Sequence, residues 1–349
     1  MASHQDFVDY VAEQLRQAGA IRSRKMFGEY GLYCDGVFFA VICGDQLFVK
    51  VTPAGEAAFP NLPKAAPYEG ARDYLWVEDV DDRDTMSIFT SSEVLGFVDD
   101  PVLGPTGAVA IPEFGTSFVR GMLVDTQPSE FDILVRLSGF SHGTDVWLGN
   151  AKDLIVDQGI PVGQAIGCRD DIMLFLISCG MPEKRSFKIM EAVRKGRGLP
   201  DGAEEEMIAA GVPEWYIGSC KKIKYLFPKA HAVAYVMMAF RIAWFKVHEP
   251  LAFYAAYFSI RAKAFDATCM CWGMDACKAK MREIKSKENP SAVEEDMLVT
   301  LEVVYEFYLR GFHFEHVDLY RSHALNFLMD REKKSLLPPF TSIPGLGET

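Results

Sequence analysis

The sequence predicts an α+β protein in which a small α+β unit precedes a larger, mostly α-helical part. In the first 84 residues, Asp35-Gly36 and Gly44-Asp45 are hairpin signals between short apolar runs, which predicts antiparallel strands. From Thr85 onward, apolar residues recur instead at helical spacing. At 349 residues, with 49% hydrophobic and 24% charged side chains, the chain is long enough for two or three globular domains.

Residues 1–84 are expected to form one domain. A helix is predicted over residues 5–18, with an apolar face of Phe7, Val8, Val11 and Leu15. Short strands are predicted between Ser23 and Lys50, and a last strand in the YLWVEDV run at 74–80. The segment with Pro60, Pro63 and Pro67 is expected to be a loop.

Two features of this domain leave alternatives open. We interpret the aromatic cluster of Tyr30, Tyr33, Phe38 and Phe39 as the core of the small sheet, with a ligand pocket as the alternative. The basic residues Arg24 and Lys25 either contact an acidic partner or form a solvated edge.

The second part is predicted to be helical over most of its length. Helices are expected over residues 87–95, 116–124, 130–139, 170–179, 183–194, 204–210, from 213 onward, 230–245 and 294–308. The run RGFHFEHVDLYRS (310–322) suggests a short strand followed by a loop.

The helix predicted over 230–245 is almost wholly apolar. Sixteen residues give a rod of about 24 Å, and His231 and Arg241 interrupt it, so we expect a buried globular helix and no membrane partner. Its small residues Ala232, Ala239 and Ala243 would permit close packing against another helix. One stripe of this helix is expected to contain His231, Tyr235, Met238, Ile242 and Phe245.

Charge is distributed unevenly along the chain. The net charge of −12 argues against a uniformly basic nucleic-acid binder. Between Lys184 and His248, however, twelve Lys and Arg residues outnumber six Asp and Glu residues. Four lysines within nine positions, at 221, 222, 224 and 229, would suit phosphate groups, and a solvated basic face is the alternative.

The eight cysteines are expected to be free thiols. The N-terminal run MASHQDF is polar and unlike a signal peptide, so a reducing cytoplasmic location is expected. The triplet Cys269, Cys271 and Cys277 lacks a CxxC pair, so buried thiols are expected there rather than the alternative, a zinc site.

Two family resemblances divide the chain at the same place. The runs RKMFGEYGLYCDGVFFAVICGDQLFVKV and ARDYLWVEDVDDRD resemble the N-terminal domain of the TfoX competence-regulator family, which implies an interaction or regulatory role for residues 1–84. The join at Asp84 has no Gly/Ser or Pro linker, which suggests a fusion, either natural or an assembly artefact.

Residues 85–349 resemble the fingers region of the Gram-positive PolC type of DNA polymerase III. The resemblance is carried, in order, by IPEFGTSFVRGML, LSGFSHGTDVWLGNA, IGCRDDIM, FKIMEAVRKGRGLP, PEWYIGSCKKIKYLFPKAHA, YFSIRAKAFD and PPFTSIPGLGE. It implies a fingers region over 85–335 and the truncated start of a helix-hairpin-helix element over 336–349.

The resemblance implies DNA-directed DNA synthesis, a nucleotidyl transfer, in the complete polymerase. Its partners would be a DNA primer-template, deoxynucleoside triphosphates and other replisome subunits. The Mg²⁺ of the complete polymerase is held by palm aspartates upstream of the matched region, and no counterpart is found here. We therefore expect no catalytic residue and no cofactor bound by this chain alone, unless another polypeptide supplies the palm. Asp170 and Asp171 are interpreted as acids at a helix start.

The resemblance also implies which residues contact the ligands. Candidates for nucleotide or phosphate binding are Arg169, Lys221, Lys222, Lys224, Lys229, Ser141, His142, Gly143 and Asp145. Candidates for the DNA backbone are Arg194, Lys195 and Arg197, where glycines permit close approach. Tyr235 and Arg241 are expected in the core or behind the nucleotide, and a position facing the nucleotide is the alternative. The alternative function is a TfoX-like regulatory or interaction protein with a passenger polymerase segment.

Overall fold

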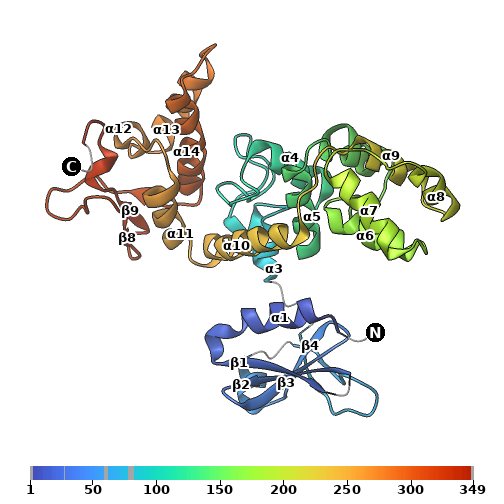
Figure 1. Cartoon of the computed structure of the whole chain (residues 1–349). Helices are drawn as coiled ribbons and strands as arrows, with labels where there is room; N and C mark the ends of the chain where they lie inside the picture. The colour runs from blue at the N-terminus through green and yellow to red at the C-terminus, as the bar shows by residue number, and fades with distance from the viewer. Residues whose placement is uncertain (1–2, 27, 59–61, 78–81, 347–349) are drawn as a thin grey trace. The chain divides into compact units, whose positions relative to one another are not determined.

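The computed structural model describes residues 3–26, 28–58, 62–77 and 82–346. The chain divides into two compact units, Met1–Arg83 and Asp84–Thr349. The first is built on a β-sheet and the second mainly on α-helices, which confirms the predicted α+β class (Figure 1).

The first unit is a six-stranded antiparallel sheet with a helix on one face. Its elements are α1 (Gln5–Gln14), the 3-10 turn η1 (Arg16–Ala18), β1 (Ile21–Met26), β2 (Glu29–Cys34), β3 (Val37–Cys43), β4 (Gln46–Val49), α2 (Pro53–Ala58), β5 (Lys64–Ala65) and β6 (Tyr74–Val77). The strand order is β1-β2-β3-β4-β6-β5. Both predicted hairpin turns are present, and Asp35, Gly36, Gly44 and Asp45 all have positive φ, as such turns require. Of the last predicted strand, residues 78–80 lie outside the described residues, and so does Pro60 of the predicted loop.

Strand alternation divides the aromatic cluster of this unit between the two faces of the sheet. Val8 and Val11 of α1 pack with Tyr30, Leu32 and Ile42 in one core, and Phe39 packs against it. Tyr33 and Phe38 form a cross-strand pair on the opposite face, where their rings are half-buried. The predicted core position is therefore correct for Tyr30 and Phe39 and wrong for Tyr33 and Phe38.

The first half of the second unit is helical. It contains α3 (Arg83–Ser87), the 3-10 turn η2 (Glu93–Leu95), α4 (Ser117–Thr126), α5 (Phe131–His142), two π-helical turns η3 (Trp147–Ala151) and η4 (Asp153–Asp157), the 3-10 turn η5 (Val162–Gln164), α6 (Arg169–Ser178), α7 (Glu183–Arg194), α8 (Ala203–Ala209), α9 (Glu214–Lys222) and α10 (Lys229–His248). The continuous helix predicted over 87–95 is wrong. The Ser91 side chain accepts a hydrogen bond from the Glu93 backbone, so the serines favour a turn there.

The second half adds short helices and a small sheet. It contains α11 (Pro250–Ala256), the π-helical turn η6 (Tyr257–Arg261), α12 (Ala267–Met270), α13 (Met274–Lys285), α14 (Ala292–Leu309), β7 (His313–Phe314), β8 (Leu328–Asp330), β9 (Ser335–Leu337) and the 3-10 turn η7 (Phe340–Ser342). Strand β9 pairs in parallel with β7 and antiparallel with β8. Helices α11 and α13 and strands β8 and β9 were not predicted from the sequence.

Helix α10 is buried on only one face, which corrects the prediction of a buried helix. Ala232, Ala239 and Ala243 are fully buried, so the predicted close-packing face is present. The predicted stripe lies largely on the surface: Tyr235 is 50% exposed, Met238 52% and Phe245 47%. Within the described residues, α10 is the one helix long and apolar enough to span a membrane, judged by length and composition alone.

Candidate functional site

Two of the segments singled out by sequence are joined by backbone hydrogen bonds. The Thr144 amide, in the loop after α5, donates to the Tyr225 carbonyl at 3.0 Å. The Lys224 amide donates back to the Thr144 carbonyl at 3.0 Å. The SHGTD loop and the lysine-rich segment therefore form one short bridge, although about 80 residues separate them in sequence.

Two glycines permit this approach. A Cβ atom on Gly143 would lie 2.4 Å from Cγ2 of Val146 and 3.1 Å from the Tyr225 carbonyl oxygen. A Cβ atom on Gly196, whose φ is +68°, would lie 2.5 Å from the Lys224 carbonyl oxygen. The VRKGRG loop thus packs against the same backbone, which gathers all three predicted binding segments around residue 224.

An aromatic cluster covers this junction, and we define it as His142, Phe227, His231 and Tyr235. The His142 ring stacks on Phe227, with centroids 4.9 Å apart and an interplanar angle of 27°. The Phe227 ring also contacts those of His231 and Tyr235, at 5.9 and 6.4 Å. Because Tyr235 is 50% exposed, its predicted core position is wrong, and the ring is available for stacking.

Glu113 positions His142 and was not identified from sequence. Its Oε2 atom lies 2.5 Å from Nε2 of His142. The backbone of Glu113 has a φ of +68°, which is uncommon for a residue other than glycine. The signal available in the sequence was its place in the IPEFGTSF run.

The five basic candidates around α9 and α10 are not equivalent. Lys221 pairs with Glu204 at 2.5 Å, and Lys222 donates to the Gly149 carbonyl at 2.7 Å. Lys229 lies 3.3 Å from Asp132, and Arg169 lies 3.9 Å from Asp170. Lys224 is exposed, and its ammonium has no ion pair or hydrogen bond within the described part of the chain. It is therefore the lysine most available to an anionic ligand.

The three DNA-backbone candidates also differ. Glu191 accepts two hydrogen bonds from Arg194, at 2.7 and 2.8 Å, and lies 2.9 Å from the Lys195 ammonium. These bonds lower the pKa of Glu191 to about 2. Arg197 is exposed and has no ion partner among the residues that the structure describes. The free positive charge on this loop is therefore that of Arg197.

The remaining candidates lie nearby but in separate environments. The Ser141 hydroxyl donates to the Ser138 carbonyl at 3.0 Å, within its own helix. Asp145 is exposed in the loop, with a φ of +55°. Arg241 is half-buried on α10 and lies 3.9 Å from the Met238 sulfur. An apolar groove of about 450 Å³ extends farther along α10, and its lining includes Pro112, Ile242, Phe245, Phe253 and Ile260.

The acidic pair at the start of α6 does not fit a catalytic metal ion. One carboxylate oxygen of Asp171 accepts from the amides of Gly167 and Cys168, both at 2.9 Å, and from Arg136 at 3.1 Å. Asp170 accepts from the Lys229 amide at 3.1 Å. Both acids cap and brace helices, as expected from sequence. No group of three His, Cys, Asp or Glu side chains suited to a metal occurs within 3–26, 28–58, 62–77 and 82–346.

The cysteine triplet consists of free thiols. Burial raises the pKa of Cys269 to about 11 and that of Cys277 to about 12. Both thiols are therefore protonated at neutral pH in this fold.

Two family matches overlap at the junction between the units. Residues 13–88 match the TfoX N-terminal domain, and residues 75–213 match the bacterial DNA polymerase III alpha subunit finger domain. The fingers candidates up to Arg197 fall within the second match, and Lys221 to Arg241 lie beyond it.

Curated relatives extend the similarity through most of the chain. A PolC-type DNA polymerase III of Listeria monocytogenes is 56% identical over 268 residues, which is 76% of this chain and 18% of the relative. PolC-type polymerases of Streptococcus suis and Caldanaerobacter subterraneus subsp. tengcongensis are each 54% identical over 77% of the chain and 19% of their own length. The chain therefore spans less than a fifth of these relatives.

Proposed function

Because this chain joins a TfoX N-terminal-like domain to a fingers segment similar to PolC-type DNA polymerase III, we propose that it binds a DNA primer-template and a nucleoside triphosphate without catalysing DNA synthesis by itself. In the complete polymerase, Mg²⁺ would supply the activation of the primer hydroxyl and the stabilisation of the leaving pyrophosphate. Among the described residues, no group of three His, Cys, Asp or Glu side chains is suited to a metal ion, so no catalytic step is assigned to this chain.

The observation that carries the proposal is the arrangement around residue 224. Lys224 and Arg197, both exposed and without an ion partner among the described residues, lie on segments that pack together at Gly196. The aromatic cluster of His142, Phe227, His231 and Tyr235 lies close by, because Phe227 follows Lys224 by three residues and contacts the other rings. Positive charges hold phosphates, and aromatic faces stack on bases, so the combination suits a nucleic acid or nucleotide.

The remaining assignments follow from the family. Lys221, Lys222, Lys229 and Arg169 would strengthen the local positive field, although each contacts an acid or a carbonyl within the fold. Arg194 and Lys195 would bind a DNA phosphate only if that phosphate displaced the carboxylate of Glu191. A cytoplasmic location, contacts with other replisome subunits and the absence of a membrane partner are part of the same proposal.

A second candidate function is favoured by the first unit. Residues 13–88 match the TfoX N-terminal domain, and Met1–Arg83 form a compact unit with a core of its own. A regulatory or interaction role based on that unit would leave the polymerase-like part as a passenger.

A binding titration separates the two candidates. Fluorescence anisotropy of a labelled primer-template is measured as the full chain is added at low salt. Saturable binding that the Arg197→Ala/Lys224→Ala variant loses supports the fingers proposal. Absence of binding, or equal binding by the variant, favours the passenger interpretation.

A further inference from the structure

The sheet of the first unit has a face that α1 does not cover, and this face carries basic and aromatic residues together. Since Leu32 faces the α1 core, strand alternation places Tyr33 on the opposite face, and Phe38 is its cross-strand partner. The two rings lie 5.4 Å apart and are inclined by 50°. Arg22 pairs in register with Tyr33, so it lies on the same face.

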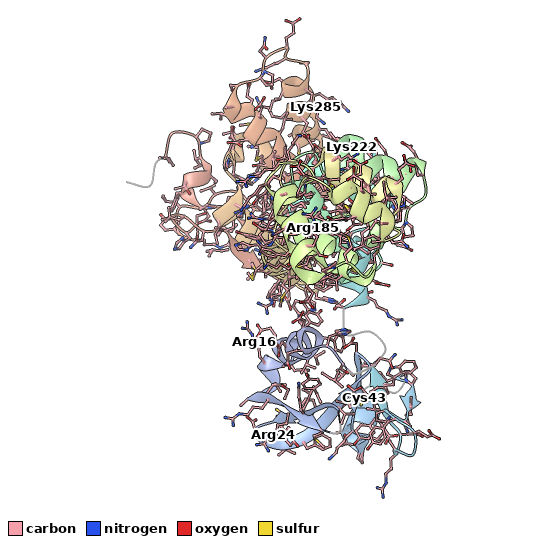
Figure 2. The ribbon with its side chains drawn as sticks, turned by 45° about the vertical axis from the view of Figure 1, so that its right-hand side comes forward. Arg16, Arg24, Cys43, Arg185, Lys222 and Lys285 are labelled. Atoms are coloured by element: carbon pink, nitrogen blue, oxygen red, sulfur yellow. The ribbon has the colours of Figure 1, made fainter. Side chains whose placement is uncertain are left out.

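Three cations surround these rings. The Arg24 guanidinium lies 5.2 Å from the Tyr33 ring centroid, and the Lys50 ammonium lies 4.3 Å from that of Phe38. Arg22, Arg24 and Lys50 are all exposed. We call Arg22, Arg24, Tyr33, Phe38 and Lys50 the β1–β3 platform. Figure 2 shows Arg24 at the sheet, away from the helical side that carries Arg16.

A hollow lies at one end of the platform. It has a volume of about 280 Å³, and its lining includes Arg22, Arg24 and Tyr33. Asp35 also borders it, but one oxygen of that carboxylate accepts from the Ala20 amide at 2.9 Å and so braces the turn. Glu29, at the other end of β2, is bound by the Ser3 amide and hydroxyl. Within the described residues, neither acid forms an ion pair with Arg22, Arg24 or Lys50.

We propose that the β1–β3 platform binds single-stranded nucleic acid. Aromatic side chains on an uncovered sheet face, such as the half-buried Tyr33 and Phe38, stack on unpaired bases, which a duplex does not present. The adjacent cations would neutralise the phosphates between those bases. An acidic peptide would satisfy the cations alone and would gain little from Tyr33 and Phe38. The proposal concerns the first unit and does not depend on the fingers surface.

The test uses the full chain and two labelled DNAs, an oligothymidylate and a blunt duplex. The Arg22→Ala/Arg24→Ala variant is expected to bind the oligothymidylate at least tenfold more weakly, and its log–log salt slope should be shallower by about 1.4, or 0.7 per lost phosphate contact. The Tyr33→Leu/Phe38→Leu variant keeps apolar side chains but loses the aromatic faces. Its affinity should fall by about fivefold or more with an unchanged slope.

The affinity for the blunt duplex should be the same in the parent and in both variants. This comparison distinguishes the β1–β3 platform from the fingers surface. Arg16→Ala is a single-charge control, since it removes one positive charge on the side of α1, against two in Arg22→Ala/Arg24→Ala. Circular dichroism checks that each variant folds. Failure of the parent to bind oligothymidylate, unchanged binding by both variants, an equal loss in Arg16→Ala, or full displacement by polyglutamate would overturn the proposal.

Discussion

The ammonium of Lys246 and the carboxylate of Glu306 lie 2.8 Å apart in the interior of the second unit, and neither side chain is exposed. Lys246 also donates to the carbonyls of Gly107 and Val109, at 2.8 and 2.6 Å. The Tyr254 hydroxyl donates to Glu306 at 2.6 Å. Burial lowers the pKa of Lys246 to about 8, against the opposing effect of Glu306. The pair thus links α10 to α14, and the bonds from Lys246 to Gly107 and Val109 link both helices to the loop that precedes Glu113.

Removal of one member of this pair should be severely destabilising. Glu306→Gln leaves the Lys246 ammonium buried without its counter-charge, and we expect a loss of about 3–5 kcal/mol in the free energy of unfolding. Urea unfolding measures this loss. The control on the same helix is Glu302→Gln, which breaks a partly exposed ion pair with Arg120 and should cost less. The double variant Lys246→Met/Glu306→Leu should lose less than the sum of its single changes, and strict additivity would contradict a coupled pair.

The junction around residue 224 should be sensitive to a single methyl group. Gly143→Ala introduces a Cβ atom 2.4 Å from a Val146 methyl, so we expect a loss of about 1–3 kcal/mol through overpacking. Gly121→Ala is the control, because Gly121 lies within α4 and its added Cβ would meet nothing within 4 Å. That change should stabilise the protein by about 0.5–1 kcal/mol. Thermal unfolding of both variants tests the contrast, and equal effects would contradict the packing described.

The Glu191 ion pairs should make stability depend on acid pH. The folded pKa of about 2 lies below the ordinary 4.5, so the unfolded chain binds the extra proton first as pH falls. The stabilisation is therefore complete above pH 4.5 and is lost as pH decreases toward 2. The difference in unfolding free energy between the parent and Glu191→Gln should shrink over this interval. A difference that stays constant down to pH 2 would show that Arg194 and Lys195 do not hold this carboxylate.

The purified chain should not extend a primed template in the presence of magnesium and four nucleotides. Asp170 and Asp171, at the start of α6, are engaged in helix caps and an ion pair, and no group of three metal-ligating side chains occurs among the described residues, so we expect the electrostatic stabilisation of a phosphoryl-transfer transition state to be missing. A denaturing gel of labelled primer measures extension, with a complete PolC-type polymerase as the positive control. Template-dependent products from a preparation free of host polymerase would contradict this expectation.

Sequence patterns predicted the positions of helices and strands better than the burial of their side chains. Periodicity placed Tyr235, Met238 and Phe245 on one stripe of α10, but a 3.6-residue repeat does not say which stripe faces the core. In the small sheet, strand alternation places Tyr33 and Phe38 on the face opposite α1, but alternation alone does not say which face is covered by the core. Both errors concern burial, which long-range packing decides.

The sequence predicted which segments form the candidate site, but it did not predict which side chains in them pair with one another. The motifs SHGTD, VRKGRG and KKIKYLFPK do meet, because Gly143 and Gly196 allow their backbones to approach. The sequence could not show that Glu191 engages Arg194 and Lys195, because several helical residues could have served as partners. Glu113 was missed because the residue it contacts, His142, is 29 positions away.

The variant that tests the account most sharply is Arg197→Ala/Lys224→Ala, which removes the two cations that lack an ion partner within the described residues. Arg282→Ala/Lys285→Ala removes the same charge from α13 and serves as the control; Lys222 and Lys285 are labelled in Figure 2. Each protein is titrated with one labelled primer-template over a range of salt concentrations.

This salt titration measures directly whether the fingers segment holds DNA phosphates. Counterion release gives a log–log slope of about −0.9 for each duplex phosphate neutralised, so the Arg197→Ala/Lys224→Ala slope should be shallower by about 1.8. Its affinity should fall for every sequence alike, because phosphate contacts carry no sequence information. The α13 control should match the parent. An unchanged slope and affinity in the Arg197→Ala/Lys224→Ala variant would contradict the proposed DNA-binding surface.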